Sequence, residues 1–424
     1  MGCDLEAVEG AIRGAVLAAG AKCLEEFMNA VGAGRRVERI KCLCGGIMQS
    51  RGVREKQVLT LLGTARYRHS LFQCPSCKKT RYPGDEALDI VDTSRSPGLR
   101  RQTARLGAKE SFGEVAKDLR ELAAIEISRK DAERVSEAMG EAMEQWDAVQ
   151  RRHVRTLEPP PPDIPKTIDT LYIEFDGTGV PMTKEEVAGR KGKQKDGSAK
   201  TREAKLGCVF TQTAFDEKGR PIRDPASTSF TGGIETASVF GWRIFAEAVR
   251  RGLYEAKRVI LLTDGAEWIK GIAATHFPGA IHIIDLYHVR EHLVDLCKQL
   301  FDRNLKQLNR YKDRWWDDLD EGNIDKIIHE ARKLLPTDTT EAKDARKEIA
   351  YLEKNKERMR YKQFKEQGLF LGSGVIEAGC KNVIGQRMKQ SGMEWSVRGA
   401  NAIIALRCME ASGRTEDYWE QRTA

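Results

Sequence analysis

Three acidic residues occupy positions from which a folded chain could bring their carboxylates together. Asp176 directly follows the apolar segment 171–175, and Asp264 closes the segment RVILLT. Glu377 falls in the first turn of a helix that we predict to begin with Ser373 as its N-cap. Carboxylate oxygens bind Mg²⁺, and two such ions about 4 Å apart promote displacement at phosphodiesters. A first-turn glutamate is also favoured by the helix dipole alone, so the prediction of a two-metal site rests on the three acids together.

The elements around these acids predict a mixed sheet with helices. Strand-like segments over 171–175, over 206–216 and within 221–233 are followed by a helix over 235–251. Two apolar strands then end at Asp264 and Asp285. Three strands, a helix and two parallel strands are the order of an RNase H-like fold. In that fold the first strand lies beside the strand after the first helix, so Asp176 and Asp264 should converge.

Composition fits a protein of several domains. The chain has 424 residues, 40% of them apolar and 32% charged, which is too long for one compact core. Lys and Arg outnumber Asp and Glu by 71 to 63, and a net charge of +8 suits a nucleic-acid partner without requiring one. No apolar run is long enough to span a membrane, and acids near the N-terminus argue against an export signal. We therefore expect a cytoplasmic protein with no membrane partner.

Two cysteine pairs flank short predicted strands between residues 37 and 95. The pairs are Cys42-x-Cys44 and Cys74-x-x-Cys77. Pairs of thiolates at two turns are typical of a zinc ribbon, and the second pair has the usual spacing, whereas the first is one residue short. We predict one Zn²⁺ bound by these four thiolates; the alternative is unrelated cysteines on a β-rich module.

The next region predicts two helices joined by a tight turn. Ser111 begins the first helix with a capping-box pattern, and Ser128 begins the second. The second helix starts with basic side chains that would contact DNA: Arg129, Lys130 and Arg134. This arrangement fits a helix-turn-helix, although an ordinary helical hairpin with a solvated charged face has the same pattern.

A proline-rich segment marks the main predicted boundary. Consecutive prolines after Glu158 favour an extended, semi-rigid spacer. The predicted parts are an N-terminal helix for packing or dimerisation (1–36), a zinc-ribbon-like module (37–95), a helix-turn-helix region (96–157), the linker (158–166), the first part of the RNase H-like core (167–288), an all-α insertion (289–368) and the last part of the core with the Glu377 helix (369–424).

Basic side chains lie near two of the acids in the sequence. Those of the loop after the first catalytic strand are Arg190, Lys191, Lys193, Lys195, Lys200 and Arg202. Those that follow Glu377 on its helix are Lys381, Arg387 and Lys389. A basic, glycine-rich loop beside a metal site can bind phosphates without reading sequence; the alternative is a solvated basic loop.

Longer phrases of the sequence resemble a known family. The segments IEFDGTGVPM, LLTDGAEWI, DLYHVREHL and GSGVIEAGCKNVIGQRMKQSGMEWS are similar to those of bacterial insertion-sequence transposases of the Kra group, which is related to the Mutator-like DDE transposases. The similarity covers nearly all of the chain beyond the linker, together with the cysteine module. It implies a DNA transposase whose triad, Asp176, Asp264 and Glu377, holds two Mg²⁺ or Mn²⁺ ions.

The resemblance implies further features of the site and its partners. A Cys/Asp-x-x-His signature falls on Asp285 and His288, behind the metal ligands. The 113 residues that separate Asp264 from Glu377 exceed what one crossover helix requires and fit the helical insertion. The implied partners are double-stranded DNA, as terminal inverted repeats and as target, and further copies of the chain in a homodimer or higher oligomer.

Three functions remain open on the sequence alone. An RNase H-like nuclease or junction resolvase would share the acids with a transposase without needing the cysteine module, the helix-turn-helix or the insertion. A non-catalytic DNA-binding regulator derived from a transposase is disfavoured because the acids are intact. Joining of a 3′-OH DNA end to a second DNA separates a transposase from a nuclease.

Overall fold

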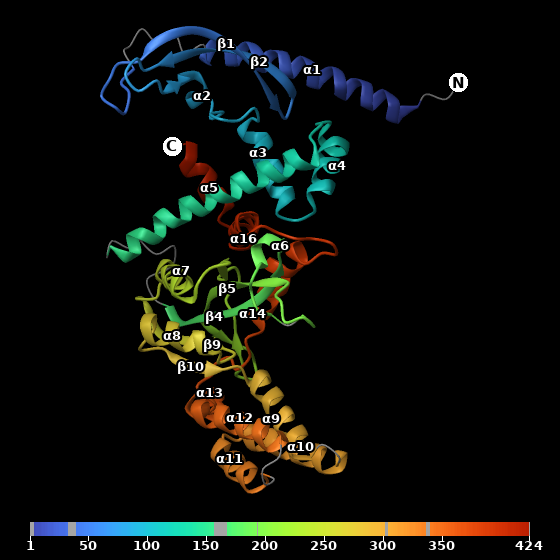
Figure 1. The fold of residues 1–424 in the computed structure, drawn as a ribbon, viewed down its shortest axis with the longest axis vertical. Helices are drawn as coiled ribbons and strands as arrows, with labels where there is room; N and C mark the ends of the chain where they lie inside the picture. The colour runs from blue at the N-terminus through green and yellow to red at the C-terminus, as the bar shows by residue number, and fades with distance from the viewer. Residues whose placement is uncertain are drawn as a thin grey trace. The chain divides into compact units, whose positions relative to one another are not determined.

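The structure is a computed structural model that describes residues 4–32, 40–156, 168–192, 194–301, 304–335 and 340–423. The chain divides into two compact units, residues 1–139 and 140–424, which are drawn together in Figure 1. The division falls inside helix α5 (Arg129–Arg155). The predicted proline-rich linker, residues 158–166, lies outside the described residues.

The first unit contains a long helix, a β-hairpin and short helices. Its elements are α1 (Leu5–Gly32), β1 (Gln49–Thr60), β2 (Gly63–Gln73), β3 (Thr80–Arg81), α2 (Pro83–Ala87), α3 (Pro97–Gly107), α4 (Phe112–Ala123) and the start of α5. Strands β1 and β2 pair antiparallel around a turn where Gly63 has φ +115°. Val58, Ala65 and Tyr67 of this hairpin pack against Met28 of α1. The predicted N-terminal helix is therefore present, and its second half is the part that the hairpin covers.

Helices α4 and α5 begin where the sequence predicts. The Ser111 hydroxyl accepts the N–H of Glu114 at the start of α4, and the Ser128 hydroxyl accepts the N–H of Asp131 at 3.1 Å. Ala124 ends α4 in the left-handed conformation with φ +55°. The two caps are confirmed, while the DNA-binding role of the helix pair stays a prediction.

The second unit is built on a five-stranded mixed sheet. Its strands are β4 (Ile168–Pro181), β5 (Thr201–Gln212), β8 (Ser229–Gly233), β9 (Ala256–Thr263) and β10 (Ile281–Ile284), and the short pair β6 (Ala214–Phe215) and β7 (Pro221–Ile222) stands apart from the sheet. The strand order is β10-β9-β4-β5-β8. Strand β5 is antiparallel to β4 and β8, whereas β9 is parallel to β4 and β10. Strand β4 is therefore central and paired on both sides.

Helices cover both faces of this sheet. The helices near it are α6 (Lys184–Val187), α7 (Ala237–Arg250), α8 (Glu267–His276), α14 (Gly374–Gly379), α15 (Gln386–Met388) and α16 (Val397–Ala411), and the last helix, α17 (Thr415–Thr423), packs against α5. Ile173 and Phe175 of β4 pack into one apolar core with residues of α7 and α8. Successive side chains of a strand alternate between faces, so Glu174 and Asp176 lie on the opposite face, the one that α14 contacts.

A group of helices separates β10 from α14 in the chain. It comprises α9 (Leu286–Phe301), α10 (Leu305–Asp320), α11 (Ile324–Lys333), α12 (Thr340–Asn355), the 3₁₀ turn η1 (Lys356–Arg358) and α13 (Tyr361–Glu366). In Figure 1 these helices gather at one end of the second unit, beyond β10. The described part of residues 289–368 is thus helical, as the sequence predicts. No helix in the described ranges is long and apolar enough to cross a membrane.

Glu247 of α7 is a buried carboxylate held by two arginines. Its oxygens contact the guanidinium groups of Arg250 and, at 3.8 Å, Arg414. Burial raises the pKa of Glu247, but attraction by Arg250 and Arg414 outweighs burial and brings the pKa down to about 2 from the ordinary 4.5. Because the pKa is lowered on folding, the ion pairs stabilise the fold above about pH 4.5, and this contribution is lost as the pH falls toward 2.

Replacing Glu247 by Gln should lower the free energy of unfolding by about 3 kcal/mol at pH 7, because it removes the buried negative charge that Arg250 and Arg414 face while both guanidinium groups stay buried. Urea unfolding at pH 7 and pH 3 measures this, and the difference from wild type should shrink at the lower pH. Glu217→Gln, in the exposed turn between β6 and β7, is the matched control and should change stability by less than about 0.5 kcal/mol. A Glu247→Gln protein as stable as wild type at pH 7 would contradict this role.

Candidate active site

The strand register sets Asp176 and Asp264 at the same level of the sheet. Glu174 of β4 pairs with Leu262 of β9, and the parallel pairing ends there. Asp176 of β4 and Asp264, the residue after β9, each lie two residues farther along the chain. Neighbouring strands are about 4.8 Å apart, so the two carboxylates lie near each other where β4 and β9 part, and the charge of Asp264 acts on Asp176. Strand β4 itself does not end at Phe175, as the sequence suggested, because its pairing with β5 continues to Pro181.

Helix α14 brings Glu377 to the same edge. Cys380, one helical turn beyond Glu377, has its Sγ 3.9 Å from Oδ2 of Asp176. The helix can approach the sheet closely because of Gly379, where an added Cβ would lie 2.6 Å from the Phe230 ring. Beyond Gly379 the helix continues as a π-helical turn, η2 (Cys380–Gly385), a feature found often at functional sites. The exposed Glu377 carboxylate therefore joins Asp176 and Asp264 in a loose acidic cluster, in which the charges of Asp264 and Glu377 both act on Asp176.

The pKa of Asp176 reflects the nearby acidic groups. Burial raises the pKa of Asp176, and the negative charges of Asp264, Glu203 and Glu377 raise it further, against the lowering effect of the Gly177 N–H. Mutual repulsion of this kind is relieved by a bound cation, and an all-oxygen donor set suits Mg²⁺ or Mn²⁺.

Asp285 lies behind this cluster rather than in it. Its Oδ1 accepts the backbone N–H of His288 at 2.7 Å, and its Oδ2 accepts the N–H and the hydroxyl of Ser373. The buried carboxylate thus caps α9 and holds the start of α14. The prediction that the Ser373 side chain caps α14 is wrong, because its hydroxyl is directed to Asp285 and, at 3.4 Å, to Glu377.

Two further acids near this site were not predicted from the sequence. Glu203 of β5 lies over Gly177, where an added Cβ would come within 2.3 Å of Oε1 of Glu203. Glu174 is fully buried beneath α14. Burial raises the pKa of Glu174 to about 8; the Ile376 N–H lowers it, and the charges of Asp285 and Glu377 raise it further. Only the pairing of β4 with its neighbours reveals either acid as part of the site.

Most of the basic residues predicted to bind DNA are exposed. These are Arg129, Lys130, Arg134, Arg190, Lys191, Lys195, Lys200, Lys381 and Lys389. Arg202 is half-buried beside Glu186, and Lys193 lies outside the described residues. Lys389 donates to the hydroxyl of Thr178 at 2.5 Å, two residues beyond Asp176 on β4. Arg387 is fully buried with its guanidinium 5.0 Å from the Trp395 ring, so the prediction that it contacts DNA phosphates is wrong.

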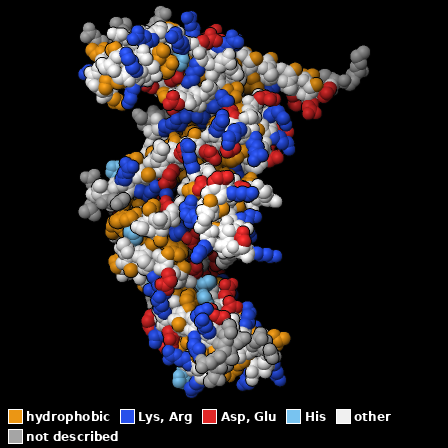
Figure 2. Space-filling view, in the orientation of Figure 1, with side chains coloured by type: hydrophobic (Ala, Val, Ile, Leu, Met, Phe, Trp, Pro, Cys, Tyr) orange, Lys and Arg blue, Asp and Glu red, His pale blue; other side chains and the backbone are white. Residues whose placement is uncertain are grey.

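Basic and acidic side chains are mixed on the visible surface. On the face drawn in Figure 2, Lys and Arg are interspersed with Asp and Glu rather than gathered into one field. Contact with DNA would therefore depend on local groups such as the 190–202 loop and not on the net charge.

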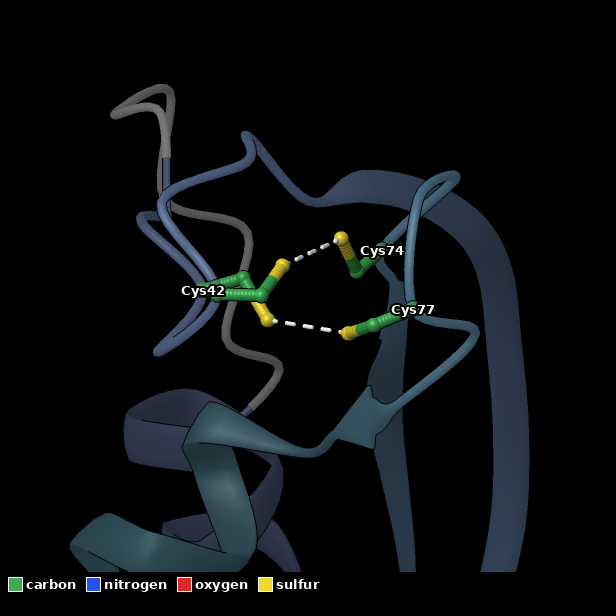
Figure 3. A group of neighbouring side chains, drawn as sticks. Cys42, Cys74 and Cys77 are labelled. Atoms are coloured by element: carbon green, nitrogen blue, oxygen red, sulfur yellow. Dashed lines mark hydrogen bonds between the residues drawn. The ribbon is translucent and has the colours of Figure 1, made fainter.

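The four predicted cysteine ligands converge in the first unit. Cys42 and Cys77 have their sulfurs 3.4 Å apart, and those of Cys44 and Cys74 are 3.5 Å apart. In Figure 3 a dashed line joins Cys42 to Cys77, and Cys74 lies beside Cys77 on the turn opposite Cys42. All four sulfurs lie within 4.8 Å of one another, whereas sulfurs around one tetrahedral Zn²⁺ are about 3.8 Å apart. Over the described ranges, this is the one group of three or more candidate ligands that is so compact.

The conformation of the two turns explains why Cys42 and Cys44, with one residue between them, can still face Cys74 and Cys77. Gly45 takes φ +85°, and an added Cβ on Gly46 would lie 3.1 Å from the Cys74 sulfur, so two glycines allow the tight first turn. At the second turn, the backbone N–H groups of Cys77 and Ser76 lower the pKa of the Cys74 thiol to about 6, against the raising effect of burial. At Cys77 the Lys79 N–H lowers the pKa, but hydrogen bonds with Cys42 and Cys44 outweigh it and raise the pKa to about 11. Four cysteine sulfurs at this spacing suit one Zn²⁺.

Comparison with known proteins adds little to this geometry. The profile of a family described as "Uncharacterised protein family (UPF0236)" matches residues 239–423, a segment that holds Asp264, Asp285 and Glu377. A solved structure, "Drosophila P element transposase strand transfer complex", is similar with 11% identity over 77% of this chain and 80% of that chain, at a TM-score of 0.26. This likeness establishes neither the fold nor the activity of the present chain. No curated protein matches it.

Proposed function

We propose that this protein is a DNA transposase of an insertion sequence, which cuts and joins DNA at transposon ends with two Mg²⁺ ions. The observation that carries the proposal is the meeting of Asp176, Asp264 and Glu377 at one edge of the five-stranded sheet. The phrases around these acids that resemble insertion-sequence transposases agree with it.

The strand order supports the proposal, because it agrees with the order expected of an RNase H-like core. Three antiparallel strands, β4, β5 and β8, are followed by a helix and by two strands parallel to β4. Helices α9 to α13, between β10 and the helix that bears Glu377, would then be the insertion. In such a core two of the acids would belong to neighbouring central strands and the third to a helix packed against the sheet.

In this proposal different residues of the site bind the metal ions, the phosphates and the DNA backbone. Asp176, on the rigid central strand, together with Asp264 and Glu377 would hold the ions; when bound, these ions polarise the attacking oxygen and stabilise the leaving one. Lys389, fixed at Thr178, is placed to contact a phosphate near these acids. The 190–202 loop and the first turns of α5 would bind the DNA backbone, and transposon ends and target DNA are the partners of a homodimer or higher oligomer.

The cysteine cluster has a structural task in this proposal. Zn²⁺ bound by Cys42, Cys44, Cys74 and Cys77 would stabilise the zinc-ribbon-like module, because four thiolates complete a closed tetrahedral site. Such a site leaves no coordination position for a substrate, so the zinc would serve folding and not the chemistry.

A strand-transfer assay tests the proposed activity. Purified protein is incubated with Mg²⁺, a supercoiled target and duplexes made from the DNA that flanks the gene, ending in a free 3′-OH. We expect joined products that depend on Mg²⁺ and on the flanking sequence. Cleavage without joining would instead indicate an RNase H-like nuclease, and DNA binding with neither reaction would indicate a regulator.

Neutralising Arg190, Lys191 and Lys195 should weaken binding to all DNA sequences about equally. Each side chain that no longer neutralises a phosphate reduces the slope of log affinity against log salt by about 0.9, so the slope should fall by up to three such steps. Fluorescence anisotropy on terminal and unrelated duplexes, at several salt concentrations, measures the change. A variant that neutralises Lys333, Lys343 and Lys347, exposed on α11 and α12, removes the same charge and should keep the wild-type slope. A changed sequence preference at an unchanged slope would mean that the loop reads bases.

A further inference from the structure

Glu174 has a buried carboxyl group that none of the roles above uses. It lies two residues before Asp176 on β4 and on the same face of that strand. Its side chain is 0% exposed. One oxygen, Oε2, accepts the backbone N–H of Ile376 at 2.8 Å, and the other, Oε1, has no hydrogen-bond partner among the described residues.

Stability alone does not account for a carboxylate at this place. Burying an acidic group is costly, and one hydrogen bond from a backbone N–H offsets only part of that cost. The Cys208 thiol on β5 donates a second, weaker hydrogen bond to Oε2 at 4.0 Å. An apolar side chain of equal size would fill the space between β5 and α14 without the cost of a buried carboxyl. The Glu174 side chain is therefore better explained by a role in positioning a neighbouring element.

That task lies at the start of α14. The first N–H groups of a helix have no partner within the helix, and Ile376 is one residue before Glu377 in this first turn. The residue expected to cap this end, Ser373, is engaged with Asp285 instead. Glu174 thus accepts an N–H that a local cap would otherwise satisfy, and it does so from the strand that carries Asp176.

We propose that Glu174 is a positioning residue, which fixes the start of α14 and thereby the carboxylate of Glu377 relative to Asp176. The inference rests on the proposed function, since that function gives Glu377 its task as a metal ligand. Strand β4 is a suitable reference because it is hydrogen-bonded on both sides, to β5 and β9. A single side chain then ties two of the three metal ligands to one rigid element.

Three substitutions in the full-length protein test the role. Glu174→Gln keeps an acceptor oxygen at the same reach and should behave like wild type in the strand-transfer assay. Glu174→Leu keeps the volume but has no acceptor, and it should raise the Mg²⁺ concentration for half-maximal joining by ~10–100-fold. Glu174→Asp withdraws the acceptor by one methylene and should fall between them. Excess Mg²⁺ should partly restore joining by the Leu variant, and DNA-end binding should stay unchanged in all three.

Hydrogen exchange at the Ile376 amide gives a readout that does not depend on activity. The amide should be protected in wild type and Glu174→Gln and should exchange faster in Glu174→Leu. If wild type joins no DNA, the proposed function fails. The exchange measurement still shows whether Glu174 fixes the start of α14. If the Leu variant does not fold, Glu174→Asp carries both measurements. A folded variant without the acceptor that keeps the wild-type Mg²⁺ dependence and the wild-type amide protection would overturn the inference.

Discussion

Asp176→Ala, Asp264→Ala and Glu377→Ala are each expected to abolish DNA cleavage and joining while leaving binding of the transposon end in place. Removing one carboxylate leaves the two-ion site incomplete, and loss of charge stabilisation of several kcal/mol corresponds to a rate loss of at least ~10³-fold. Phosphodiesters are so inert that no background reaction masks the loss. Binding should be retained because the proposed function assigns it to the basic loop and the first unit, and it should not weaken when a repelling charge is removed.

A gel shift with terminal DNA, run beside a Mg²⁺-dependent cleavage and joining assay on the same preparations, measures both quantities. Asp295→Ala is the matched control, because Asp295 is an exposed acid on α9 whose ion pair is with Lys298; its activity should equal that of wild type. Full joining by the Glu377→Ala protein would refute the triad. Loss of DNA binding in parallel with activity would mean that the acids serve the fold and not the chemistry.

Cys74→Ser and Cys77→Ser are expected to lose the bound zinc and, with it, the structure of the module around residues 40–95. Binding of Zn²⁺ to four thiolates contributes on the order of 10 kcal/mol to a small zinc module, and this module has only a small apolar core around Val58, Ala65 and Tyr67. Metal analysis should find one zinc per wild-type chain and less than stoichiometric zinc in the variants. Limited proteolysis should cut the variants between β1 and β3 while wild type resists.

Cys23→Ser provides the control for this experiment, because Cys23 is an exposed cysteine on α1 outside the cluster. It should retain both the zinc and the resistance to proteolysis. A wild-type chain that is purified folded and without stoichiometric zinc would contradict the proposed metal site and leave the four cysteines as free thiols.

The sequence by itself determined the elements and most of the candidate site, because those signals are local. Asp176 and Asp264 each follow an apolar segment and precede glycine, and the caps at Ser111 and Ser128 depend on residues only three positions away. The convergence of the cysteines also followed from composition, since thiolates spaced along two turns have few other uses in a reduced protein. Local hydrophobic period and turn chemistry suffice for such predictions.

The tertiary structure alone decided which side chains surround the acids. Strand β4 continues past Phe175 because its pairing with β5 outlasts its pairing with β9, and no local pattern encodes that difference. Arg387 looked like a DNA contact on a basic helix, yet it packs on Trp395, because the exposed face of a helix is set by what the helix packs against. Glu174 and Ser373 have partners that lie 202 and 88 residues away in the chain. Their roles depend on the strand register and on the position of α14 against the sheet, and both exist only once distant segments have paired.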